Sequence, residues 1–302
     1  MKNTHHPLFS ATFFCVGTLV LWSIGPVCIK YLTGYLDSPT QNALRYTVAC
    51  AFWLPMLVIA LKKGTVTAQL CKRALLPSAA NIVMQCLWAG MFYHINPSLA
   101  VLLTKTNVLW IAVLSMLLIP AERALLRKPR FWLGFGLSLT GVFGVLYFKP
   151  DMALSGNVMG ITISLLVAFF WSVYVIAVKI CMQRTDSRTS FAVISVYTVI
   201  GLWIAAFGFG DIRACLDMGL KPWGILILSA VLAIALGHVF YYAAMKRAGT
   251  TVPALVILVQ PAVILGMSKF MFDEQVNMMQ GVFGMVLLLG AGFAIWARKG
   301  QG

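Results

Sequence analysis

The sequence predicts an all-α polytopic membrane protein whose ten transmembrane helices form two inverted five-helix repeats. Its 302 residues are 61% hydrophobic and only 10% charged, whereas about a quarter of the residues of a typical soluble domain are charged. Its apolar segments are close to the roughly 20 residues that a helix needs to cross a bilayer. Short patterns also occur twice, in the same order, in the two halves of the chain.

Ten apolar segments follow one another with only short connections, so no separate soluble domain is expected. They occupy residues 10–31, 40–61, 75–94, 98–119, 131–148, 158–180, 190–209, 223–245, 251–272 and 279–297. The first lacks an A-x-A-like cleavage site and is too long for the core of a signal peptide. We therefore expect it to be retained as the first transmembrane helix.

Basic residues are concentrated on alternate connections. One side holds Lys2, Lys62, Lys63, Lys72, Arg73, Arg123, Arg127, Lys128, Arg130, Arg184, Arg188, Lys246, Arg247, Arg298 and Lys299, and the other holds Lys149, Arg213 and Lys221. Cytoplasmic loops are enriched in Lys and Arg, so both termini are predicted to be cytoplasmic. Membrane topology then explains the net charge of +15, and no nucleic acid partner is needed.

Several kinds of chemistry are not indicated by the sequence. The seven cysteines are isolated from one another, and no C-x-x-C or Cys/His cluster suggests a disulfide framework or a metal site. No G-x-x-x-x-G-K-[ST] motif is present, so ATP is not expected to power transport within this chain. We expect no cofactor.

The two halves of the chain resemble each other. Leu21-Trp22-Ser23 with Lys30 recurs as Phe170-Trp171-Ser172 with Lys179, Phe92-Tyr93 recurs as Phe240-Tyr241, and Val142-Phe143-Gly144 recurs as Val282-Phe283-Gly284. These matches divide the chain into repeats at residues 1–150 and 151–302. Because each repeat has an odd number of helices, the second must be inverted in the membrane. Inverted repeats are a recurring design of secondary transporters, with the substrate site near the midplane.

Further motifs are Trp-Ser in the first and sixth segments, Gln260-Pro261 in the ninth, and the acidic residues Glu122 and Glu274 after the fourth and ninth. Together with the repeat, they resemble the EamA-type drug/metabolite transporter family. The first half departs from the pattern, because Leu109-Trp110 stands where the proline would be. The resemblance implies an exporter or facilitator of amino acids or other small metabolites in a bacterial inner membrane. It also implies that helices one to four and six to nine surround a central cavity, with helices five and ten at the periphery.

The segment from Ser98 to Pro120 is apolar at almost every position but carries Lys105 near its middle, with Asn107 nearby. A lone ammonium group in hydrocarbon costs at least a few kcal/mol, so it normally faces a protein interior or a water-filled cavity. No Asp or Glu lies in any apolar segment to pair with it. Lys105 is therefore a candidate to bind a substrate carboxylate, and snorkelling to the outer surface is the alternative. For Asn107, a structural hydrogen bond between helices is an equal alternative.

Two other segments carry polar stripes. The third places Asn81, Gln85 and Trp88 on one helical face, which predicts either a cavity wall or helix packing. The eighth places His238 one turn before Tyr241. These two residues are candidates to bind substrate or relay a proton, and a hydrogen-bonded core histidine is the slightly favoured alternative.

Trp22 and Trp171 occupy equivalent positions near the middle of the membrane. Tryptophan usually lies at the membrane interface, so this depth favours positions that face protein. They are candidates to line the cavity and pack the apolar part of a substrate. Gln260 joins this set because Pro261, which follows it, breaks a backbone hydrogen bond and frees a carbonyl.

Other features of the segments are interpreted structurally. Snorkelling is the expected role of Lys30, Lys179, Lys269 and Arg45, which lie near helix ends. Glycines in the fifth and tenth segments predict close helix packing; they are Gly134, Gly136, Gly141, Gly144, Gly281, Gly284, Gly290 and Gly292. A dimer contact there is the weaker interpretation, and a monomer is slightly favoured.

The leading hypothesis is a secondary transporter that moves a small metabolite by alternating access, with an amino acid or related carboxylate as the best candidate. A nucleotide-sugar or phosphorylated substrate is the main alternative, and it would call for more cavity cations than Lys105 alone. A membrane enzyme acting on lipids is less favoured, because acids or metal ligands near the surface would be needed. A receptor that does not transport is the remaining alternative.

Overall fold

The computed structural model describes residues 7–118, 128–148, 154–182, 185–248, 253, 256–273 and 277–298. These residues form helices and short turns, with no strand among them. The acidic residues Glu122 and Glu274, and several of the basic residues used to predict orientation, lie outside the described residues.

Six helical stretches of the described chain are long and apolar enough to cross a membrane. They comprise α1 (Pro7–Leu32), α2 (Ser38–Lys62), α3 (Ala68–Trp88) with α4 (Met91–His94), α8 (Leu154–Cys181), α9 (Ser187–Phe209), and α10 (Leu220–Ser229) continued by η3 (Ala230–Leu236) and α11 (Gly237–Ala248). Their outward side chains include large exposed apolar groups such as Phe207 and Phe209. The chain is a multi-pass membrane protein, as predicted.

The other described helices are α5 (Pro97–Thr104), α6 (Asn107–Leu118), α7 (Pro129–Tyr147), α13 (Gln260–Phe272) and α14 (Met278–Arg298), with a short 3₁₀ turn, η2 (Ile212–Asp217). Helix starts follow local chemistry at several places. The side chain of Asp37 accepts a hydrogen bond from the Thr40 N–H at the start of α2, and Asp186 caps α9 in the same way. Such caps satisfy amides that have no partner within the helix.

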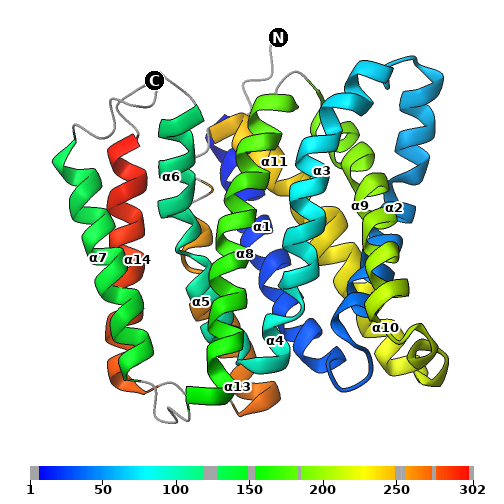
Figure 1. The fold of residues 1–302 in the computed structure, drawn as a ribbon. Coiled ribbons are helices and arrows are strands. Elements are labelled where there is room, and N and C mark those ends of the chain that lie inside the picture. Colours follow the sequence, from blue (N-terminus) through cyan, green and yellow to red (C-terminus); the bar gives the residue numbers. More distant parts are fainter. Residues whose placement is uncertain are drawn as a thin grey trace.

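α7 and α14 pair along their lengths at one edge of the bundle (Figure 1). A Cβ on Gly141 would overlap the Leu287 backbone, and one on Gly144 would overlap the Phe283 ring. The predicted close packing is thus confirmed at these positions. It is wrong at Gly136 and Gly281, where a Cβ would meet open space.

Around the centre, α1 packs against α11, and α3 packs against α8. α2 and α9 pair at the edge opposite α7 and α14 (Figure 1). α13 packs between α1 and α5. These contacts bring residues that are far apart in the sequence to one central region.

Several of the predicted segments are not regular α-helix throughout. The 98–119 segment is divided at Lys105–Thr106, and the 75–94 segment at Ala89–Gly90. The 223–245 segment contains a π-helical stretch, η3, a form often found at functional sites. The pattern of apolar segments did not indicate these irregularities, and side chains of other elements contact the first of them, as described below.

Candidate substrate-binding cavity

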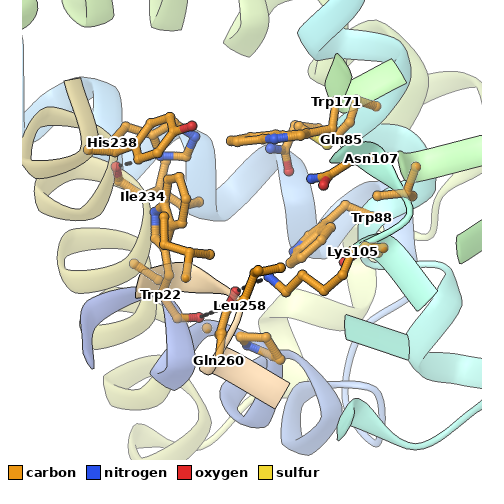
Figure 2. A pocket seen from close by; sticks show the side chains of 18 of the residues that line it. Trp22, Gln85, Trp88, Lys105, Asn107, Trp171, Ile234, His238, Leu258 and Gln260 are labelled. Carbon is orange, nitrogen blue, oxygen red and sulfur yellow. Dashed lines mark hydrogen bonds between the residues drawn. The ribbon is translucent and has the colours of Figure 1, made fainter. Parts of the chain in front are cut away.

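A cavity inside the bundle is lined at the Lys105–Thr106 break and at the π-helical stretch η3 (Figure 2). The volume of the cavity is about 120 Å³. If each water needs 10–15 Å³, the cavity has room for roughly ten waters. Its lining residues are Trp22, Gly25, Pro26, Arg45, Met84, Gln85, Trp88, Thr104, Lys105, Asn107, Val108, Ile111, Val167, Trp171, Ala233, Ile234, His238, Tyr241, Ile257, Leu258 and Gln260. None of these described residues is acidic.

Lys105 reaches across the cavity in Figure 2. Its Nζ donates a hydrogen bond to Gln260 Oε1 at 2.7 Å, and Gln260 Nε2 donates to the Trp22 carbonyl at 2.9 Å. The lysine is only 6% exposed, so it does not snorkel to the surface. An ammonium group can donate three hydrogen bonds, and Gln260 accepts one of them.

The backbone around Lys105 explains how a charge is held at this depth. Between α5 and α6 the helix tightens, and the amides of Lys105 and Thr106 bond to carbonyls three residues earlier. The Asn107 carbonyl lies 3.0 Å from Ser172 Oγ on α8. This serine therefore ties α8 to the start of α6.

Aromatic side chains form one wall of the cavity. The Trp22 and Trp171 rings meet edge to face, with centroids 5.5 Å apart. Tyr241 packs against Trp22 at 4.7 Å between centroids. A Cβ on Gly237 would lie 2.5 Å from the Trp22 ring, so the glycine allows the indole to lie against α11.

His238 faces this wall, with Gln85, Asn107 and Trp171 on the opposite side of the view (Figure 2). Its Nδ1 lies 3.0 Å from the Ile234 carbonyl, and a carbonyl can only accept. Nδ1 therefore carries a hydrogen, and Nε2 of the neutral ring is an acceptor. Nε2 is buried without a hydrogen-bond partner in the described part of the chain.

Arg45 of α2 also lines the cavity, although the sequence pattern suggested snorkelling. It is 2% exposed, and its Nε donates to Ser229 Oγ at 3.0 Å. Its Nη1 is buried and has no partner among the described residues. The snorkelling prediction was wrong for this residue, because α2 begins at Ser38 and places the guanidinium almost two turns inside. The depth argument used for Lys105 could have found it.

Nine of the ten predicted site residues line the cavity: Lys105, Asn107, Trp22, Trp171, Gln85, Trp88, His238, Tyr241 and Gln260. Asn81 lies outside this lining. Its side-chain amide donates to Tyr46 Oη and Thr198 Oγ1, so helix packing describes its contacts. Figure 2 shows the predicted residues converging from separate elements.

The three remaining lysines near helix ends differ. Lys179 and Lys269 are exposed, as snorkelling predicts. Lys30 is partly buried, and its Nζ donates to the Phe92 carbonyl at 2.8 Å. None of them lines the central cavity.

A second cavity, of about 250 Å³ by the same measure, lies between the ends of α8 and α11 and the start of α9. Tyr241 lines both cavities. Beside it, the hydroxyls of Tyr174 and Tyr242 are hydrogen-bonded to each other. Tyr241 therefore stands between the two cavities, and the tyrosine pair lines the second one.

Comparison with known proteins identifies the fold and the family. One solved crystal structure of a protein is similar over 94% of this chain and 96% of its own, with a TM-score of 0.66 and 18% sequence identity. This likeness shows the fold alone. No curated protein matches the chain. The model of the EamA-like transporter family matches twice, over residues 9–147 and 158–296. The chain therefore belongs to the EamA-like transporter family of membrane proteins that move small molecules.

Proposed function

We propose that this protein is a secondary transporter of a small carboxylate, such as an amino acid or a related metabolite, that works by alternating access. The observation that carries the proposal is Lys105, a buried cation at a helix break that lines a central cavity without an acidic partner among the lining residues. A buried charge is costly unless it is paired. A substrate carboxylate would supply the missing partner.

The lining suggests a role for each part of the substrate. Lys105 would hold the carboxylate, and Gln260 would orient the ammonium group through its hydrogen bond to it. The Trp22, Trp171 and Tyr241 rings would pack an apolar side chain. The cavity volume of about 120 Å³ favours a small metabolite over a nucleotide sugar.

We infer that α5–α6, α7, α13 and α14 complete ten crossings as two inverted five-helix repeats, 1–150 and 151–302. Two contacts support the symmetry: α1 packs on α11 and, in the corresponding places, α8 packs on α3. Helices interrupted near the midplane are also typical of inverted-repeat transporters, whose halves rock around the site.

We place the protein in a cell inner membrane with both termini in the cytoplasm. In this orientation the second cavity would face the cytoplasm. Tyr241 and the Tyr174–Tyr242 pair would then separate the substrate site from an inner vestibule. Moving these side chains apart would connect the two cavities. Alternating access would pair this opening with closure on the outer side.

Counterflow in proteoliposomes tests the proposal. Vesicles containing the purified protein are loaded in turn with amino acids, organic acids, polyamines and sugar phosphates, and uptake of the labelled solute is measured. We expect exchange of carboxylates and its loss, by about tenfold or more, in Lys105→Ala, because a hydrogen bond to a charged group contributes roughly 1.5–3 kcal/mol. Lys269→Ala, which removes an exposed lysine, should exchange like the wild type.

Exchange of a cation that survives in Lys105→Ala would reject the carboxylate and keep the transporter. A folded protein that exchanges nothing from the panel would reject transport of these classes and favour a receptor. Turnover of a labelled lipid by the purified protein would instead revive the enzyme alternative.

A further inference from the structure

We propose that the cavity binds a small dianion, with Arg45 as a second anchor beside Lys105. The inference rests on the proposed transport of a small anion and specifies that this anion carries two negative charges. Two carboxylates or one phosphate ester would provide this chemistry. None of the described lining residues is acidic, so the cavity lining supplies no carboxylate that could pair with Arg45 or Lys105 in place of a ligand.

The charge balance of the cavity favours two negative charges. Arg45 is 2% exposed and Lys105 is 6% exposed, so water screens neither of them well. The arginine side chain is not deprotonated in proteins. A substrate with a single carboxylate would leave one buried positive charge without a counter-ion, which is costly.

Arg45 has donors to spare for a ligand. Its Nε is used by Ser229 Oγ, which itself donates to the Leu226 carbonyl. Nη1 is buried without a partner among the described residues. Nη2 lies 3.9 Å from the position of a Cβ on Gly25, another lining residue. The guanidinium is thus fixed at one end and free to donate at the other, a geometry that suits a carboxylate or phosphate.

The test compares small solutes that differ in negative charge. Counterflow and ligand-induced thermal stabilisation are measured for a four-carbon dicarboxylate, a four-carbon monocarboxylate, a three-carbon phosphate ester and inorganic phosphate. The variants are Arg45→Gln, Arg45→Lys and the control Arg213→Gln, whose side chain is exposed on η2.

We expect the wild type and Arg213→Gln to prefer one of the organic dianions over the monocarboxylate by at least about tenfold. Arg45→Gln should abolish that preference by lowering dianion exchange far more than monocarboxylate exchange, and Arg45→Lys should retain part of it. The dicarboxylate and the phosphate ester distinguish the two sources of the charge. If Arg45→Gln fails to fold, two results still test whether Arg45 is a second anchor. They are the preference of the wild type for organic dianions and the partial retention of that preference in Arg45→Lys.

Several results would overturn the inference. Equal exchange of monocarboxylate and dianions by the wild type, or a preference that survives in Arg45→Gln, would contradict a second anchor but leave carboxylate transport standing. A chloride requirement for monocarboxylate exchange would assign Arg45 to an inorganic anion. Dianion binding that depends on Arg45 without any flux would support the anchor and reject the transporter.

Discussion

The two halves of the chain interrupt corresponding helices in different ways. In the second half, Pro261 follows the turn at Leu258–Val259 and has no N–H to continue the preceding helix. In the first half, the break at Lys105–Thr106 has no proline or glycine. Side chains of other elements contact this break: Ser172 Oγ lies near the Asn107 carbonyl, and Gln260 accepts a hydrogen bond from Lys105. The second break thus has a local cause in the sequence, whereas the first has only tertiary contacts beside it.

The halves also differ in what they bring to the cavity. The first supplies both cations, Lys105 and Arg45, and the second supplies the neutral groups His238, Tyr241 and Gln260. The hydrogen bond between Lys105 and Gln260 joins the two breaks directly. The two repeats therefore contribute differently to the cavity, and both positive charges come from the first repeat.

The largest expected effect concerns this bond between the halves. Gln260→Leu should destabilise the protein by about 1.5–3 kcal/mol, because it leaves a buried ammonium without its acceptor. Lys105→Met in the same background should recover much of that loss. Thermal and denaturant unfolding in detergent would measure the double-mutant cycle. Additive effects of the two substitutions would show that the bond contributes nothing.

A second prediction compares equivalent glycines of the paired peripheral helices. A Cβ on Gly144 would overlap the Phe283 ring, whereas one on Gly284 would meet Leu102 at 3.4 Å. Gly144→Ala should therefore destabilise the protein by about 1–3 kcal/mol through overpacking, and Gly284→Ala should be close to neutral. Unfolding measurements on both variants check this difference. Equal tolerance at the two positions would mean that α7 and α14 can move apart at little cost.

The smallest expected effect concerns the equivalent serines. Among the described residues, Ser23 Oγ bonds only to the Leu19 carbonyl of its own helix, whereas Ser172 Oγ lies near both the Ala168 and Asn107 carbonyls. Ser172→Ala should cost about 1 kcal/mol more than Ser23→Ala, because it removes a contact between α8 and the start of α6. Paired unfolding curves and exchange rates would show the difference. Identical behaviour of the two variants would contradict a supporting role for Ser172.

Much of the site was predictable because membrane depth is a strong constraint. A lysine or tryptophan near the middle of an apolar segment must face protein or a cavity, and Lys105, Trp22 and Trp171 all line the cavity. Arg45 was missed because it lies close to the start of its segment, where snorkelling is the usual explanation.

Other features depend on tertiary contacts that a helical pattern does not contain. Asn81 and Gln85 are one turn apart on α3, yet Asn81 bonds to Thr198 on α9 and Gln85 lines the cavity. Nothing in Thr104–Asn107 resembles a helix stop, so the first break could not be predicted. The π-helical stretch η3 likewise consists only of apolar residues, from Ala230 to Leu236, so its sequence does not distinguish it from a regular α-helix.

The central claim is that the ammonium group of Lys105 binds the substrate carboxylate, and chemical rescue tests it most directly. Lys105→Cys would be made in a variant that lacks the seven native cysteines and retains carboxylate exchange. The new thiol would then be converted to its aminoethyl thioether or to a neutral ethyl thioether. We predict that exchange is lost in Lys105→Cys, returns with the aminoethyl group and stays lost with the ethyl group. Normal exchange by the unmodified variant, or equal rescue by both groups, would contradict the claim.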